Sequence, residues 1–343
     1  MSTAPSLDVR LAGYLAKLWG EPVSVEGLSR IPGGASRETY RFDARRANGE
    51  VKPLILRRDP PGSLIDTDRK LEYLAFQSFH GWGVPVPEAV ALEEGDAALD
   101  RPFFIMTRIP EGVAASPFTL DPYGEAAKTI GEQFFTILGR IAAADPAELP
   151  IAAATEVPKP QDCWKIALDH WEGVIREDAL TPQPIVLAMI RRLRRTPPPP
   201  SAKVSAVHGD YRTGNFLHHQ GKITAVLDWE MAHIGDPHED LGWAFDPLWR
   251  HFDMDRVAGM VSREEAIAIW ERASGLKVDP VALAWWEGFA AVKGAAIWIS
   301  SAKEYRDGGG KDPVLGFTGV YCGRRQDEIL ADRLALMLKG EAA

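Results

Sequence analysis

A predicted β-hairpin in the second half of the chain constrains the fold and its chemistry more than any other segment. Two short apolar runs, 216–218 and 223–227, are separated by a four-residue turn that contains a glycine. Asn215 precedes the first run and Asp228 follows the second, so antiparallel pairing brings both to the open end of the hairpin. Asp210 lies five residues before Asn215 and can join them. Two carboxylates and an amide oxygen are the hard ligands that Mg²⁺ prefers, so the sequence predicts a divalent-cation site.

The spacing of these residues also matches a known catalytic arrangement. In protein kinases the catalytic loop reads H-R-D-x-x-x-x-N, and D-F-G follows further along the chain. Here H-G-D begins at position 208, N stands at 215 and D-W-E begins at 228. The stretches VHGDYRTGNFL and AVLDWEMAHIGDPHEDLGW resemble the aminoglycoside and choline phosphotransferase family, the small-molecule branch of the protein-kinase-like fold. Within that family, the Arg-Arg-x-Pro-Pro-Gly stretch at 57–62 resembles the kinase-like module found with acyl-CoA dehydrogenases.

The resemblance covers residues 25–250 and implies an α+β, bilobal protein-kinase-like fold. We expect a small, β-rich N-terminal lobe at 1–108, which would bind the nucleotide. A larger, mostly helical C-terminal lobe at 109–343 would carry the catalytic loop and the acceptor site. Alternating and apolar runs predict strands at 25–31, 39–44, 54–56, 89–92, 103–107 and 204–207. Apolar residues at helical spacing predict helices at 66–79, 121–144, 162–177 and 184–195, with three or four more beyond residue 240.

The resemblance assigns roles to the hairpin residues and their neighbours. Asp210 would orient the acceptor hydroxyl and accept its proton, and Asn215 and Asp228 would hold Mg²⁺ on the nucleotide phosphates. Three further residues are expected to support the site structurally and not as ligands: His208, Asp236 and Asp240.

A loop rich in small residues lies between the first two predicted strands. Gly33, Gly34, Ala35 and Ser36 stand where a phosphate-covering loop belongs, because backbone N–H groups approach phosphate closely only where side chains are small. The loop lacks the kinase G-x-G-x-x-G pattern, so a plain hairpin is the competing interpretation.

Four residues of the N-terminal part are further candidates for nucleotide binding. Arg57 stands where kinases have a phosphate-binding lysine, and an arginine there keeps the charge and can bind phosphate with two nitrogens. Arg58 points to the opposite strand face, which favours Arg57. Glu72 is the expected partner of Arg57, with a solvated helix glutamate as the alternative. The segment with Met106 and Arg108 resembles the inter-lobe hinge, whose backbone would meet adenine.

The resemblance implies an ATP-dependent, Mg²⁺-dependent kinase that phosphorylates a hydroxyl of a small molecule. The acceptor stays open. Residues 208–255 hold nine acidic and three basic residues, which favours a cationic acceptor such as an aminoglycoside or choline. The subgroup resemblance instead favours a hydroxyacyl-CoA or a hydroxy acid. A pseudokinase that binds nucleotide or a partner without transfer is the alternative from another functional class.

Composition narrows the remaining possibilities. The 343 residues carry a net charge of −9, which argues against a nucleic-acid partner. Two cysteines fit a reducing compartment, and the chain has neither a signal-peptide pattern nor a long apolar run. We therefore expect a cytoplasmic protein without a membrane segment; its oligomeric state is not readable. A serine hydrolase and a Rossmann oxidoreductase are excluded, because neither G-x-S-x-G nor a G-x-G-x-x-G after a strand occurs.

Overall fold

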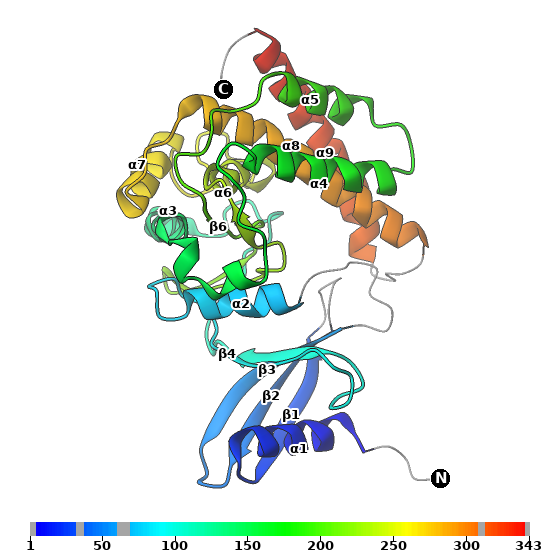
Figure 1. Ribbon diagram of the computed structural model, residues 1–343. Helices are drawn as coiled ribbons and strands as arrows, with labels where there is room; N and C mark the ends of the chain where they lie inside the picture. The colour runs from blue at the N-terminus through cyan, green and yellow to red at the C-terminus, as the bar shows by residue number, and fades with distance from the viewer. Residues whose placement is uncertain (1–4, 32–37, 60–68, 308–312, 340–343) are drawn as a thin grey trace.

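The computed structural model describes residues 5–31, 38–59, 69–307 and 313–339. Figure 1 shows a sheet built from the N-terminal strands, in blue and cyan, and a larger, mostly helical part built from the later residues. The α+β, bilobal protein-kinase-like architecture expected from the sequence is therefore confirmed. Within the described residues, no helix is both long enough and apolar enough to cross a bilayer.

The N-terminal part is a five-stranded antiparallel sheet with the order β1-β2-β3-β5-β4. Its strands are β1 (Val23–Ile31), β2 (Glu38–Arg46), β3 (Val51–Arg58), β4 (Ala89–Glu93) and β5 (Phe103–Thr107). Every strand predicted in this region is present, and most are longer than predicted. Strand ends are hard to place from sequence, because pairing with a neighbour extends a strand beyond its apolar run.

A helix covers each face of this sheet, and β3 shows how the sequence separates the two faces. Leu54 and Leu56 face a cluster that includes α1 (Leu7–Trp19), whereas Ile55 faces the cluster that includes α2 (Arg69–Phe79). Successive side chains of a strand point to opposite faces, so this three-residue apolar run serves both clusters. We did not predict α1, although its leucines at positions 7, 11 and 15 recur every four residues.

The C-terminal part is organised around one long buried helix, α8 (Pro280–Asp307). Side chains on all sides of its first four turns are buried, and Trp285, Trp286 and Phe289 form part of the core. Helices α4, α5, α6 and α9 pack against it. The other helices are α3 (Ala127–Ala143), α4 (Cys163–Asp178), α5 (Pro184–Arg195), α6 (His238–Ala244), α7 (Arg263–Ser274) and α9 (Pro313–Lys339), with short 3-10 turns at 124–126, 146–148, 150–153 and 247–249.

Two small sheets position residues 208–228 within this helical part. The predicted hairpin is present as β7 (Phe216–His219) and β8 (Lys222–Val226). The predicted strand at 204–207 is β6 (Ser205–Val207), which pairs with β9 (His233–Gly235). We did not predict β9, because three residues are too few for an alternating pattern to be recognised.

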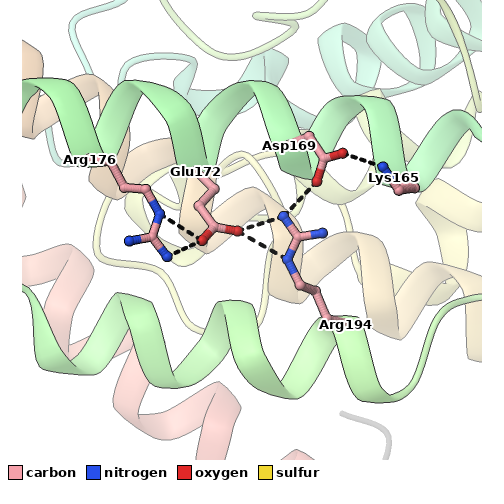
Figure 2. A network of polar contacts seen from close by, with 5 residues as sticks. All are labelled: Lys165, Asp169, Glu172, Arg176 and Arg194. Carbon is pink, nitrogen blue, oxygen red and sulfur yellow. Dashed lines mark hydrogen bonds and ion pairs between the residues drawn. The ribbon is translucent and has the colours of Figure 1, made fainter.

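A network of charged side chains joins α4 to α5 on the surface (Figure 2). Arg194 of α5 bonds to Asp169 and to Glu172 of α4, with nitrogen–oxygen distances of 2.6 and 2.5 Å. Each acid also pairs with a base one turn away on α4, namely Lys165 and Arg176. Because Arg194 is the only member of this network on α5, its side chain carries the link between the two helices.

We predict that Arg194→Gln lowers the free energy of unfolding by about 1 kcal/mol, since exposed ion pairs contribute little and this one bridges two acids. Urea unfolding should show the loss at low salt and a smaller loss at high salt, because salt screens exposed charges. Arg195→Gln, at an exposed neighbouring position, is the control and should leave stability unchanged. A loss that does not depend on salt would mean that Arg194 acts through packing.

Candidate active site

The loop between β6 and β7 is held by a buried carboxylate from the first turn of α6. Asp240 accepts hydrogen bonds from the backbone N–H groups of His208, at 2.6 Å, and Gly209, at 2.9 Å. Burial raises the pKa of Asp240 to about 6, and Lys293 and the two backbone donors oppose that shift. Gly209 has a φ of +83°, and a Cβ there would lie 2.2 Å from the carbonyl oxygen of Met231. The loop path therefore requires glycine at this position.

The hydrogen bonds of His208 assign its tautomer. Its Nδ1 accepts a hydrogen bond from the backbone N–H of Asp210 at 3.1 Å, so the ring proton lies on Nε2, which donates to the carbonyl of Leu227 at 2.9 Å. Burial lowers the pKa of His208 to about 4, so the ring is neutral at physiological pH. His208 thereby connects the loop to the end of the hairpin, as its expected structural role requires.

The buried neutral ring gives a prediction for His208→Gln. Between pH 6.5 and about pH 4, the His208 ring is protonated in the unfolded wild type but neutral in the folded protein. Acidification therefore lowers the stability of the wild type in this window. The variant lacks this effect. The stability advantage of the wild type should therefore shrink by a few kcal/mol between pH 6.5 and pH 4.

Urea unfolding at several pH values measures this difference. His80→Gln, at an exposed histidine, is the control. A stability difference between the wild type and His208→Gln that is constant with pH would contradict the neutral assignment.

Three side-chain donors hold the carboxylate of Asp210 in one orientation. Asn215 Nδ2 donates to Oδ2 at 2.6 Å. Arg212 Nε and Trp243 Nε1 donate to Oδ1 at 3.0 and 2.8 Å. We did not predict either of these last two residues. Arg212 stands inside the quoted motif, whereas Trp243 lies on α6, 33 residues away, with no local signal.

Asn215 and Asp228 meet at the open end of the hairpin, as its geometry requires. The backbone N–H of Leu227 donates to the carbonyl of Asn215 at 2.8 Å, which places Asp228 beside Asn215. Asn215 uses Nδ2 to bond Asp210, and its Oδ1 makes no hydrogen bond with the described residues. Asp228 has a φ of +64°, a strained conformation for a non-glycine residue and one that often marks a functional site.

The oxygens of these two residues fit a magnesium ion. The Asp228 carboxyl is 36% exposed, so one carboxylate and one amide oxygen are available at the same edge. No group of three or more His, Cys, Asp and Glu with metal-binding geometry occurs in the described part of the chain. Mg²⁺ commonly takes one or two carboxylates and completes its coordination with water and substrate phosphates.

Arg57 connects the sheet to this edge. It forms an ion pair with the fully buried Glu72 of α2, and its Nη2 lies 3.7 Å from Asp228 Oδ1 and 3.9 Å from Glu230 Oε2. Burial lowers the pKa of Arg57, but the three carboxylates outweigh burial and raise it above its ordinary value. Arg58 points to the other face and pairs with Glu38 at 2.7 Å. The structure therefore shows the expected Arg57–Glu72 pair.

The candidate phosphate-covering loop lies outside the described residues. It consists of Gly33, Gly34, Ala35 and Ser36.

Asp236 accepts hydrogen bonds from His238 N and Nδ1 at the start of α6, which is a structural position.

The hinge candidates are engaged within the N-terminal sheet. Met106 is paired with both β3 and β4. The backbone N–H of Arg108 donates to the carbonyl of Pro53, and its side chain bonds Asp43. These contacts hold Arg108 against the sheet, and the expectation that the backbone of this segment meets adenine stays a prediction.

Comparison with known proteins gives a consistent result. The model of the "Phosphotransferase enzyme family" matches residues 27–276. A putative aminoglycoside phosphotransferase from Ralstonia eutropha has a similar structure, with a TM-score of 0.74, 19% identity, and coverage of 95% of this chain and 98% of that chain. Aminoglycoside phosphotransferase APH(4)-Ia, solved with AMP-PNP and hygromycin B, has a TM-score of 0.60, 18% identity, and coverage of 95% and 97%.

The sequence relatives are longer proteins, and this chain matches only a part of each. Mouse acyl-CoA dehydrogenase family member 10 is 27% identical over 64% of this chain and 21% of its own length. Chicken acyl-CoA dehydrogenase family member 11 is 24% identical over 70% of this chain and 30% of its own length. The chain thus spans less than a third of the length of either relative.

Proposed function

The chain belongs to the phosphotransferase enzyme family, and from that premise we propose that it transfers the γ-phosphoryl group of ATP, with Mg²⁺, to a hydroxyl group of a small molecule. The observation that carries the proposal is the position of Asp210, whose carboxylate is fixed by three donors beside the oxygens of Asn215 and Asp228. A rigid acceptor for a hydroxyl proton next to hard oxygen ligands is what in-line phosphoryl transfer requires.

Each residue would perform a distinct task. Asp210 would orient the acceptor hydroxyl and take its proton. Asn215 and Asp228 would hold Mg²⁺, which when bound neutralises charge on the nucleotide phosphates. Arg57 would add a fixed positive charge near the same phosphates, and Glu72 would position it. Catalysis would come mostly from positioning and from charge neutralisation.

Two acceptor classes and one non-catalytic alternative follow from the relatives. The structural neighbours include a complex with hygromycin B, which suggests an aminoglycoside. The sequence relatives are named as acyl-CoA dehydrogenase family members, which suggests a hydroxyacyl-CoA or hydroxy acid. The alternative is a pseudokinase that binds nucleotide without transfer; the intact Asp210, Asn215 and Asp228 argue against it.

We predict that ATP raises the melting temperature more strongly with Mg²⁺ than without it, and that Asp228→Asn removes most of the additional rise. The reason is that Asp228 would supply the charged ligand for the ion. Thermal-shift titrations with ATP and GTP measure this and compare the two nucleotides. Asp255→Asn, at an exposed aspartate, is the control. No shift with either nucleotide would refute both the kinase and the pseudokinase that binds nucleotide.

We predict that Asp210→Asn keeps nucleotide binding but lowers turnover by about 10²- to 10⁴-fold, because the amide cannot accept the hydroxyl proton. The assay follows transfer of labelled phosphate from ATP to 3-hydroxyoctanoate, choline and kanamycin. Full activity of the variant would refute the role of Asp210. Nucleotide binding by the wild type without transfer to any hydroxyl compound would favour the pseudokinase.

A further inference from the structure

A cavity lies next to the loop that carries Asp210, and we call it the aromatic cavity. Its volume is about 440 Å³, which is within the range of small-molecule sites. The loop, the turn after α6, α8 and α9 all contribute to its wall. Its lining residues are Pro117, Phe118, Arg212, Pro247, Leu248, Trp249, Phe252, Met254, Trp298, Thr318, Tyr321, Cys322 and Arg325.

Two contacts join this cavity to the carboxylate of Asp210. Arg212 lines the cavity, donates to Asp210 Oδ1 at 3.0 Å, and lies over the ring of Trp249 with its guanidinium 4.7 Å from the ring centroid. Trp243, which also donates to Asp210, packs against Trp249 with ring centroids 5.3 Å apart. The wall of the cavity is thus in direct contact with the groups that orient Asp210, although Asp210 itself is not one of the lining residues.

The charged side chains that line the aromatic cavity are all positive. Its two charged residues are arginines, and no carboxylate lines it. Arg212 uses Nε and Nη1 for Asp210 and the carbonyl of Thr213, and its Nη2 makes no hydrogen bond with the described residues. Arg325 pairs with Glu328 at 2.6 Å, but the two side chains are 42% and 64% exposed, so this pair contributes little and is easily exchanged.

Several carboxylates of the acidic segment 208–255, in contrast, are bonded inside the protein. Asp246 is buried and accepts from Leu248 N and Gln326 Nε2. Glu239 is buried between Lys293, at 2.9 Å, and His233, at 3.1 Å. These carboxylates are occupied and are not part of the cavity wall, so they offer no complement to a polycation.

We propose that the aromatic cavity is the acceptor site and that it takes a hydroxyl-bearing organic anion with an apolar body. Arg325 would bind the anionic group, since a guanidinium pairs well with a carboxylate or phosphate. The apolar body would pack on Trp249 and its neighbours, and the hydroxyl would reach Asp210. This inference rests on the proposed phosphotransferase function.

The reaction at this site balances without a further reactant. The acceptor oxygen forms a bond to the γ-phosphorus of ATP, and the bond from that phosphorus to the β,γ-bridging oxygen breaks. ADP leaves with the electron pair of the broken bond, and the hydroxyl proton passes to Asp210. The products are a phosphate monoester, ADP and one proton.

The test compares binding of matched ligands by isothermal titration calorimetry. The ligands are 3-hydroxyoctanoate, its uncharged methyl ester, 3-hydroxyoctanoyl-coenzyme A and the polycation kanamycin. The proteins are the wild type, Arg325→Gln and Arg324→Gln. Arg324 is the matched control, because it is an exposed arginine on the same helix that does not line the cavity.

We expect an anionic ligand to bind at least about tenfold more tightly than the ester, the size of one hydrogen bond to a charged group. Arg325→Gln should remove that preference, and Arg324→Gln should keep it. If the free acid binds more tightly than the thioester, the anionic group that the cavity binds is a carboxylate. If the thioester binds more tightly than the free acid, the anionic group is a phosphate of the carrier. Equal binding of acid, thioester and ester, an unchanged preference in Arg325→Gln, tightest binding of kanamycin, or no binding would each overturn the proposal.

A parallel titration with ATP and Mg²⁺ separates this inference from the proposed function. Nucleotide binding without anion binding refutes the assignment of the aromatic cavity and leaves the kinase intact. Anion binding without nucleotide binding refutes the kinase, and with it the cavity's role as an acceptor site.

Discussion

The loop that carries Asp210 depends on one buried carboxylate, that of Asp240. In a loop between a strand and a hairpin, backbone N–H groups lack the partners that regular secondary structure provides. When such groups are buried, they need other hydrogen-bond acceptors. Asp240 satisfies two of them at once, those of His208 and Gly209, and it sits on α6, which packs on the long central helix α8. The position of Asp210 is therefore set by the helical core together with the loop's own residues, among them Gly209, Arg212 and Asn215.

Other contacts extend this support toward the sheet. His208 connects the loop to the end of the hairpin through the Leu227 carbonyl, and its ring packs on Trp229 with centroids 4.4 Å apart. Trp229 in turn stacks on Phe79 of α2 at 4.8 Å. The same helix carries Glu72, the partner of Arg57. One continuous set of contacts therefore runs from the loop through α2 to β3, so a displacement of α2 would alter both Arg57 and the residues around Asp228.

The parts of the site that are close in sequence could be predicted from it, and the distant parts could not. Asp210, Asn215 and Asp228 were brought together correctly, because hairpin geometry is local and its open end is fixed by two apolar runs. The prediction that Arg57, and not Arg58, faces the site follows from the alternation of side chains along a strand. Trp243 was missed because its contact with Asp210 depends on how α6 docks. The contacts of Arg108 with Pro53 and Asp43 could not be predicted either, because these partners lie on other strands of the sheet.

The acidic segment shows why a net charge along the chain does not give the charge of a site. Nine acidic residues in 208–255 favoured a cationic acceptor. In the fold, Glu239, Asp240 and Asp246 are buried and bonded to groups of the protein, so they contribute hydrogen bonds instead of an external field. The two charges that remain in the aromatic cavity come from Arg212, in the same segment, and Arg325, 113 positions further along the chain. The charge that a site presents depends on which charged groups reach its wall, and this follows from packing between distant elements.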